Sequence, residues 1–460
     1  MKTKIIVLFF VSIIINNAFS DLYTTGLSLQ EAGEMAVAAS KELQGEYTIH
    51  FLNEKSWFLG RSAYLPKIHL TAYEDERLSR MSADTFTKNY SIGLEQVIFD
   101  GGRLFSGRKI QKAKLAMEKN GLERKSQEIA EAAINAYRQI LALRQALQIQ
   151  ENGYGALVEQ RRILASEVSL GMVLDSDLAA ADISIRESKI EIVTKKLELS
   201  EIEKQFMDML GLERMPELKE QINLEYSASV PSVALVKSTS LARNPDLQTA
   251  KLAIDEKQEE TKFAFLSWIP TLSANGKFGL TGTSYPLTRY NWSVGLSLQF
   301  SSPWLSGDTS VSTGFEGTHQ QNFNLQGMAK PLPDPASSVN YSQVKTALDV
   351  EKAKYEIMFE RLERSAEILV DKYTYIDQKR SLVIETRELA AEKLELTKLK
   401  HKLGLLTSID LMEAQIEYTK KEIEVVQSVL NVLLAERELE KLMDMHPGEL
   451  RKLVNSEKIF

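Results

Sequence analysis

Residues 401–415 read HKLGLLTSIDLMEAQ and hold Gly404, the only glycine in the proline-free region 336–446. The rest of that region has the composition of a long helix, rich in Glu, Lys, Leu and Ala. Glycine tolerates the left-handed backbone conformation with which many helices end. The stretch therefore predicts the tip of a hairpin, where one long helix reverses into another.

The same pattern occurs earlier in the chain. LGMVLDSDLAAAD at 170–182 aligns with LGLLTSIDLMEAQ at 403–415, and residues 38–66 align with 242–270 without a gap. The matching segments follow one another in the same order in both halves, which is the signature of an internal repeat. We therefore predict one structural unit that occurs twice.

Each predicted repeat consists of a helix, two strands and a long helical hairpin. The first repeat is expected at 21–232, with strands at about 62–74 and 89–99, a hairpin at about 103–212 and a short equatorial segment at 213–232. The second is expected at 233–460, with strands at about 268–280 and 291–301, an insertion at about 303–340, a hairpin at about 341–444 and a C-terminal segment at 445–460. The sequence does not predict the place or role of the insertion.

The N-terminus has the features of a secretory signal. Two lysines precede the apolar run Ile5–Ile15, and Ala18 and Ser20 supply small residues at both positions that signal peptidase reads. We predict a cleaved signal peptide at 1–20. A short membrane anchor is the alternative, but the run is shorter than the roughly 20 apolar residues of a spanning helix.

The composition excludes several classes of function. A formal net charge of −7 and a pI near 5.6 leave no basic surface for nucleic acid. The chain has no cysteine, which excludes disulfides and thiolate metal sites. It has no nucleophile motif, no phosphate-binding loop and no HExxH, and its histidines are scattered. We expect no enzymatic activity, no cofactor and no metal site.

The strand predictions rest on residues that alternate in polarity with a period of two. In 292–300 the apolar residues are Trp292, Val294, Leu296, Leu298 and Phe300. Such strands fit either a half-buried sheet of a soluble domain or an outer-membrane β-barrel. We favour the membrane, because a signal peptide precedes the strands and their length is roughly the 9–11 residues that a tilted spanning strand needs.

Four strands cannot close a barrel, since about eight is the smallest number that encloses anything. Open sheet edges are not tolerated in lipid, so the barrel would be shared between copies, and three copies would give twelve strands. The long helices carry apolar residues at alternating spacings of three and four, as coiled coils do. Hairpins from three chains would form a helical tube, whereas the alternative for such heptads is a rigid stalk.

Four segments resemble the TolC-type outer-membrane efflux proteins: LSLQEAGEMA at 27–36, NPDLQTAKLAI at 244–254, VIFDGGRLFSGRKIQKAK at 97–114 and the paired LG…D turns. The resemblance implies a mainly α-helical homotrimer with a shared twelve-stranded membrane β-barrel and a long periplasmic helical tube. It also implies an exit duct for drugs or proteins that meets an inner-membrane transporter, of the RND or ABC type, through a periplasmic adaptor protein. A periplasmic coiled-coil adaptor or stalk is the alternative function.

Acidic residues follow both predicted tips. Asp177 and Asp410 each lie two residues after a predicted N-cap, Asp175 and Ser408 respectively. Carboxylates in a first turn stabilise a helix by about 0.3–1 kcal/mol, which would explain both without any channel. Glu413 lies one turn after Asp410, however, and has no acidic counterpart in the first repeat.

The resemblance places Asp410 and Glu413 at the constricted periplasmic entrance, where threefold symmetry would gather six carboxylates and favour cations. A basic residue that locks the entrance in the family would fall at Leu406, so this lock is absent or built differently. The residues expected at the tips and in adaptor docking are Leu170, Gly171, Asp177, Leu403, Gly404 and Ser408. The sequence identifies neither the transported substrate nor the energy source of the inner-membrane partner.

Overall fold

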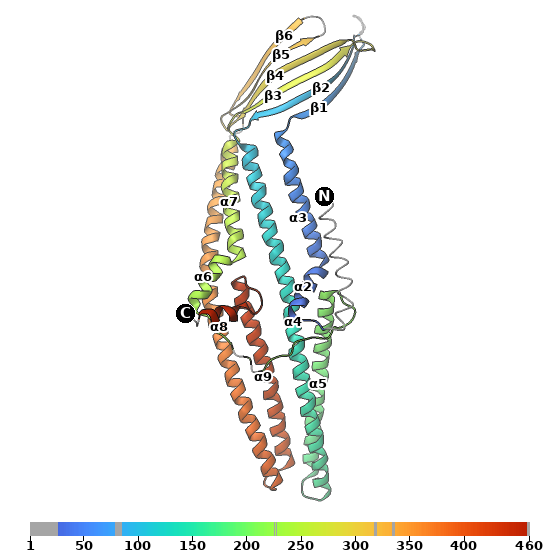
Figure 1. Ribbon diagram of the computed structural model, residues 1–460, viewed down its shortest axis with the longest axis vertical. Helices are drawn as coiled ribbons and strands as arrows, with labels where there is room; N and C mark the ends of the chain where they lie inside the picture. Colours follow the sequence, from blue (N-terminus) through green and yellow to red (C-terminus); the bar gives the residue numbers. More distant parts are fainter. Residues whose placement is uncertain are drawn as a thin grey trace. The chain divides into compact units, whose positions relative to one another are not determined.

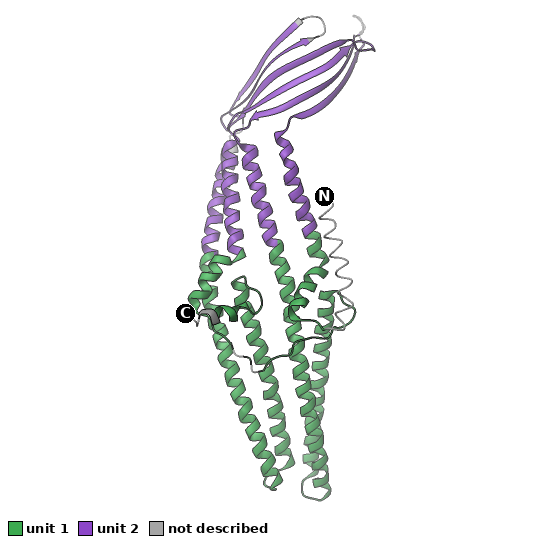
Figure 2. Ribbon diagram, viewed as in Figure 1, with its two compact units in different colours: residues 1–46, 122–245, 359–460 green, residues 47–121, 246–358 purple. Residues whose placement is uncertain are grey.

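The computed structural model describes residues 26–78, 85–224, 226, 228–316, 320–333 and 336–457 (Figure 1). The signal peptide expected at 1–20 lies outside these residues. The chain forms two compact units, unit 1 with residues 1–46, 122–245 and 359–460, and unit 2 with residues 47–121 and 246–358 (Figure 2). Each unit therefore contains segments from both predicted repeats.

Helices make up most of the described chain. They are α2 (Leu29–Ala39), α3 (Lys41–Leu59), the short 3-10 helix η1 (Gly60–Tyr64), α4 (Arg103–Ser169), α5 (Asp175–Leu210), α6 (Val233–Arg243), α7 (Pro245–Leu266), α8 (Ala336–Lys402), α9 (Ser408–Leu442) and α10 (Glu449–Glu457). Within the described ranges, no helix combines the length and the apolar composition that crossing a membrane would require.

Local sequence explains where several helices begin. Ser28 and Glu31 form a capping box on α2, and the Ser232 hydroxyl accepts from a backbone N–H of α6. Helix α4 starts after Asp100, whose carboxylate accepts from the N–H groups of Gly102, at 2.9 Å, and of Leu104, at 2.6 Å. These bonds satisfy donors that a helix start otherwise leaves unpaired.

Unit 2 contains a single sheet of six antiparallel strands in the order β1-β2-β3-β4-β5-β6. The strands are β1 (Lys67–Arg77), β2 (Thr85–Phe99), β3 (Thr271–Gly282), β4 (Arg289–Ser301), β5 (Leu305–Glu316) and β6 (Gln320–Pro331). Neighbours in sequence are neighbours in space, and each pairs with the next along most of its length.

The expectation of four strands per chain is wrong. Residues 303–340, predicted as an insertion without a place, hold β5, β6 and the first turn of α8, which begins at Ala336. The predicted barrel of twelve strands assumed four strands in each of three copies, so this count no longer has a basis. The apolar alternation that revealed β1–β4 is diluted in β5 and β6 by Gly, Ser, Thr, Asn and Gln, so their sequence resembles a loop.

The strand register assigns apolar residues to one face of the sheet. Cross-strand pairs such as Leu70 with Ile92 and Phe278 with Trp292 share this face, which remains exposed. The opposite face carries small and polar residues, including the row Ser91, Gly279 and Asn291. The sheet of unit 2 thus exposes a broad apolar surface, which soluble monomers rarely do.

Unit 1 contains two helical hairpins, one formed by residues 122–169 of α4 with α5, the other by residues 359–402 of α8 with α9. Helix α2 packs on the first hairpin, where the core includes Leu27, Tyr137 and Phe206. Helices α6 and α10 pack on the second, whose core is built on α8 and α9 around Tyr373 and Leu439. Smaller clusters join α4 to α9 and so hold the hairpins together.

Gly153 of α4 marks a close approach between the hairpins. A Cβ atom at this position would lie 2.6 Å from Oγ1 and 2.7 Å from Cγ2 of Thr419, a buried residue of α9. A Cβ atom at Gly155, two residues further along α4, would have no neighbour within 4 Å. Glycine is therefore required at 153 by packing but not at 155.

Gly153→Ala is expected to lower the thermal unfolding temperature, because the added methyl group overlaps Thr419 and costs about 1–3 kcal/mol. Gly155→Ala is the matched control and should stabilise α4 by up to about 1 kcal/mol through its higher helix propensity. Circular dichroism melts of the purified variants measure both effects. Thr419→Ala should restore much of the loss in the Gly153→Ala background, and a failure of this rescue would contradict the packing argument.

Candidate functional site at the helical hairpin tips

Both hairpins of unit 1 reverse at a glycine in the left-handed conformation. Gly171 has φ 73° and Gly404 has φ 71°. The N–H of Gly404 donates to the carbonyl of His401, and that of Leu405 donates to Lys400, both at 2.9 Å. Gly171 and Met172 form the equivalent bonds at the first tip, so each hairpin ends in a Schellman motif.

The predicted N-caps are each wrong by one residue. Helix α9 is capped by Thr407, because the hydroxyl of this residue accepts from the N–H of Asp410, and Ser408 is the first helical residue. The Asp410 carboxylate accepts in return from the backbone N–H of Thr407, at 2.9 Å, and from its hydroxyl, at 2.7 Å. At the first tip the N-cap is Leu174, which has no side-chain acceptor, and Asp175 already belongs to α5.

These bonds give Asp410 a structural role. The side-chain and backbone hydrogen bonds from Thr407 lower the pKa of the Asp410 carboxyl. A lowered pKa means that the cap stabilises the folded chain fully above the ordinary carboxyl pKa of about 4. This stabilisation is lost as the pH falls through the lower pKa of the folded state. Helix chemistry thus accounts for Asp410, as the capping explanation predicted.

Glu413 has no comparable explanation, whereas Asp177 is explained by its place at a helix N-terminus. Glu413 is exposed on α9, one turn beyond the capping box, and takes no part in it. Asp177 lies in the first turn of α5, and its backbone N–H donates to the Leu174 carbonyl. The carboxylate of Glu413 is therefore free to interact with solute or with another chain.

Ser408 lies in a small polar cluster, here called the tip cluster, with Glu167 of α4 and His401 of α8. The Ser408 hydroxyl donates to the Glu167 carboxylate at 2.6 Å and lies 2.9 Å from Nε2 of His401. His401 Nε2 is 3.6 Å from Glu167. Ser408 is only 2% exposed, so its side chain is not available for docking as the sequence suggested. It instead joins the second hairpin to the first.

Large apolar side chains surround both tip glycines and point into solvent. The exposed fractions of Leu170, Met172, Leu174, Leu403 and Leu405 lie between 69% and 74%. A Cβ at Gly171 or Gly404 would likewise meet nothing within 4 Å. Apolar residues so exposed at adjoining turns are characteristic of a surface that a partner covers.

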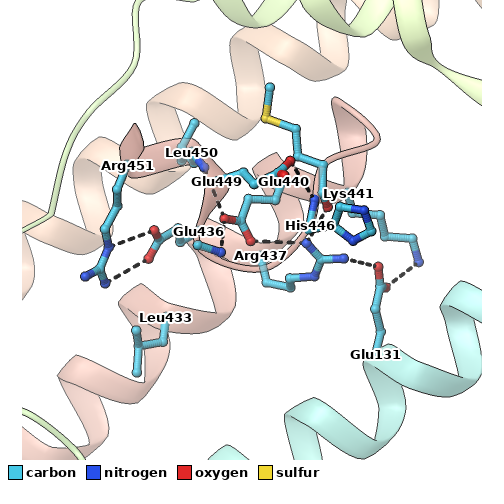
Figure 3. A network of polar contacts seen from close by, with 12 residues as sticks. Glu131, Leu433, Glu436, Arg437, Glu440, Lys441, His446, Glu449, Leu450 and Arg451 are labelled. Atoms are coloured by element: carbon cyan, nitrogen blue, oxygen red, sulfur yellow. Dashed lines mark hydrogen bonds and ion pairs between the residues drawn. The ribbon is translucent and has the colours of Figure 1, made fainter. Parts of the chain in front are cut away.

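A second polar cluster, here called the equatorial network, lies at the other end of α9 (Figure 3). Arg437 is its centre and donates to Glu131 of α4 at 2.9 Å, to Glu440 at 3.1 Å and to the Met445 carbonyl at 2.7 Å. Glu440 also accepts from the N–H groups of Gly448, at 2.6 Å, and Leu450, at 3.3 Å. Burial of Glu440 raises the pKa of its carboxyl, although the bond from Arg437 opposes this shift.

The equatorial network extends to the segment that links the two repeats. Arg451 of α10 pairs with Glu436 at 3.1 Å and lies over the ring of Tyr226, 4.0 Å from its centroid. The Tyr226 hydroxyl also donates to Glu436, and Arg380 of α8 donates to the Tyr226 carbonyl at 2.5 Å. The network thus ties α4, α8, α9, α10 and the linking segment together within unit 1.

Sequence reasoning missed the tip cluster and the equatorial network. Glu167 and Ser408 are separated by 241 positions, and no local pattern connects them. The network did leave a signal, because Arg437 and Glu440 interrupt the apolar stripe of α9 at a spacing of three. Charges on the buried side of a helix indicate partners supplied by other segments.

Comparisons with known proteins are consistent with one another. Residues 54–212 match the family described as outer membrane efflux protein. The chain is 21% identical over 397 residues to the outer membrane efflux protein BepC of Brucella suis biovar 1 (strain 1330), covering 84% of this chain and 78% of BepC.

Solved structures show the same fold. The transmembrane channel CusC matches with a TM-score of 0.75 at 12% identity, over 90% of this chain and 91% of CusC. The CmeC outer membrane channel of Campylobacter jejuni matches with a TM-score of 0.72 at 13% identity, over 90% of this chain and 85% of CmeC. TM-scores of 0.75 and 0.72 over 90% of this chain show a shared fold, although the sequences are only 12% and 13% identical.

Arg437→Met is expected to lower the free energy of unfolding by about 3–5 kcal/mol, because it leaves Glu131 and Glu440 without their buried partner. Lys441→Met is the matched control, since Lys441 also pairs with Glu131 but is largely exposed, and it should cost less than about 1 kcal/mol. Chemical denaturation followed by circular dichroism measures both. Equal costs would show that the equatorial network does not depend on Arg437.

Proposed function

We propose that this chain belongs to the outer membrane efflux protein family, which its residues 54–212 match, and is the outer-membrane exit duct of a tripartite export system. The observation that carries the proposal is the six-stranded sheet, whose one face is apolar and exposed while the other carries small polar side chains. This division is the one expected of strands with lipid on one side and an aqueous lumen on the other. The strands of one chain contribute part of a shared barrel.

Self-association is supported by a second apolar stripe on α8. Every seventh residue of α8 from Ile368 is apolar and between 57% and 65% exposed: Ile368, Tyr375, Leu382, Leu389 and Leu396. Leu403, the first residue after α8, continues the series and is 74% exposed. The opposite side of α8 is already packed in the chain's own hairpin, where Tyr373 and Leu394 are buried. A strict heptad of exposed residues is the seam of a coiled coil with another helix.

Helix α5 offers a complementary stripe in the same unit. Ile183, Ile190 and Leu197 also follow a seven-residue spacing and are at least 57% exposed. We propose that α5 of one copy packs against α8 of the next, and that three copies close the ring into a homotrimer with a periplasmic helical tube. Each helix would then bury both of its apolar stripes.

Element boundaries support the proposal of an internal duplication. Helix α2 (Leu29–Ala39) has the same length as α6 (Val233–Arg243), and α4 and α8 both have 67 residues. Buried residues recur at equivalent places, such as Ala133 of α4 and Ala366 of α8. The two repeats of the proposed duct, at 21–232 and 233–460, would be successive copies of one ancestral unit.

The tips of the hairpins would form the periplasmic entrance and the docking surface for an adaptor. The exposed side chains of Leu170, Leu174, Leu403 and Leu405 provide the apolar contact surface. Asp410 and Glu413 would line the constriction as two acidic rings, with Glu413 the residue whose position no helix cap explains. An inner-membrane transporter, driven by protons or by ATP, would supply the cargo through that adaptor.

We further propose that the tip cluster closes the entrance. The bond from Ser408 to Glu167 crosses from the second hairpin to the first, beside the turn at Gly404. It would take the place of the basic lock that Leu406 cannot provide. A duct of this kind carries out no catalysis, and the coiled-coil adaptor or stalk considered as an alternative does not account for an exposed apolar sheet.

Reconstitution in planar bilayers tests the duct directly. The proposed acidic rings should make its conductance sensitive to multivalent cations. The parent should conduct and be blocked by multivalent cations, whereas Asp410→Asn with Glu413→Gln should weaken that block by roughly tenfold or more, because six carboxylates are removed. Glu413→Gln alone should have part of this effect without disturbing the Thr407 cap.

The first hairpin supplies the control, since Asp177→Asn removes an acid from the equivalent turn and should leave the cation block unchanged. Absence of any conductance from the parent protein would refute the proposed duct. A normal conductance with an undiminished cation block in the double variant would leave Asp410 with a capping role only.

Ser408→Ala should shift the channel toward its open state. The variant removes a hydrogen bond to a carboxylate, worth about 1.5 kcal/mol or more, so the ratio of open to closed channels should rise roughly tenfold. Single-channel recording measures this ratio. Glu167→Gln should act in the same direction.

Ser166→Ala is the matched control, because the Ser166 hydroxyl donates to the Arg162 carbonyl within α4 and joins no second element. It should leave the open fraction unchanged. A Ser408→Ala channel that opens no more often than the control would remove the tip cluster from the gate.

A further inference from the structure

The hairpin of β5 and β6, here called the third hairpin, has no counterpart among the described residues of the first half of the chain, yet it is fully integrated into the sheet. Strand β5 pairs with β4 from Asn291 and Glu316 to Ser301 and Ser306. The rings of Tyr290 and Phe315 stack across this pair with centroids 5.5 Å apart. Strand β5 is therefore as firmly attached to the sheet as β1–β4 are to one another.

Glycine on β5 makes further room for β4. A Cβ at Gly307 would lie 2.8 Å from the Phe300 ring, so this ring covers the glycine from the neighbouring strand. Aromatic rings over cross-strand glycines fix the register of a sheet. The third hairpin is thus held by specific contacts to β4.

The two faces of the sheet continue across the third hairpin. Val311 and Leu325 extend the apolar face from Leu296. Ser312 and Asn324 extend the polar face. Strands β5 and β6 therefore continue both the apolar and the polar face of β1–β4.

The edges of the sheet are β1 and β6. Within the described part of the chain, no further strand pairs with either outer edge. The strands have 11 and 12 residues and run in opposite directions, so β6 of one copy can pair with β1 of another in an antiparallel ladder. Among the apolar residues of the strands, those most exposed lie on these edges, such as Leu70 at 79% and Phe323 at 71%.

We infer that β6 of one copy pairs with β1 of the next, so that the barrel is built from six strands of each chain. The inference rests on the proposed trimeric duct, in which three six-stranded sheets give eighteen strands. Barrel diameter grows roughly linearly with strand number, so this barrel is about 1.5 times as wide as one of twelve strands. Its lumen is an open aqueous channel, lined on β5 and β6 mainly by hydroxyl and amide groups together with Asp308 and Lys330, and it accommodates bulky hydrophilic cargo.

Disulfide mapping tests the edge pairing, and the absence of native cysteine makes every bond assignable. Cysteine replaces Asn322, Asn324 or Gln326 on the polar face of β6, each combined with His69→Cys or Thr71→Cys on the same face of β1. Under oxidation, at least one pair should link purified chains into dimers and trimers that withstand denaturing electrophoresis.

Ser297→Cys on β4 combined with Thr71→Cys is the matched control, because β4 would meet β1 of the next copy if the third hairpin stayed outside the barrel. Links between β4 and β1 would overturn the inference. So would an oligomer in which none of the β6 and β1 pairs forms a link.

A second measurement uses distance. Nitroxide labels at Ile92→Cys on β2 should be about 1.5 times farther apart between copies in the full chain than in a variant lacking 303–333. Equal spacing would overturn the inference. Conductance of the unmodified protein tests the proposed duct separately, so a conducting oligomer without edge links refutes the eighteen-stranded barrel alone.

Discussion

Helix α8 carries two apolar stripes, and its own hairpin can bury only one of them. Tyr373 and Val370 pack against α9, while the stripe from Ile368 to Leu396 stays in solvent. Burial of apolar surface is the main favourable term in folding and in association, at about 25 cal/mol per Å². A single copy leaves that term incomplete on its helices and on its sheet, and this unburied apolar surface favours the assembly of copies that we propose.

The buried charges of unit 1 have a different role. Isolated charges in a core are costly, but Arg437 and Glu440 are each paired several times over, with both side chains and backbone groups. Most of these partners are near in sequence, but Glu131 comes from α4, 306 positions before Arg437. Apolar stripes allow neighbouring helices to pack at more than one axial position, whereas directional hydrogen bonds to Glu131 and to the Tyr226 carbonyl define a single alignment.

Most of the fold could be predicted because its signals are local and periodic. Gly171 and Gly404 predicted both chain reversals, and the alternation in β1–β4 predicted strands with one apolar face. The resemblance to TolC-type efflux proteins was confirmed by the family match and by the shared architecture. Strands β5 and β6 were missed because their polar face is dense in Ser, Asn and Gln, which also dominate loops.

The site was less predictable. The capping box at Thr407 differs by one residue from the predicted cap, since Thr407 and Ser408 are both good caps and only backbone geometry separates them. The contact between Ser408 and Glu167 depends on how two hairpins are aligned, which no short pattern encodes. The role of Asp410 and Glu413 as acidic rings at the entrance stays a prediction.

The third hairpin also has a consequence for how such a chain can change its size. In an antiparallel sheet, each added strand moves the point where the chain leaves the sheet to the opposite end of the strands. One extra strand would therefore make α8 begin at the wrong end of the sheet. Two added strands cancel this reversal, and α8 begins at Ala336 with the direction that β4 alone would have given it. Because strands must be added in pairs, a hairpin is the smallest addition that keeps the helices in place. The diameter of the proposed barrel could therefore change in steps of two strands per chain while the helices stay the same.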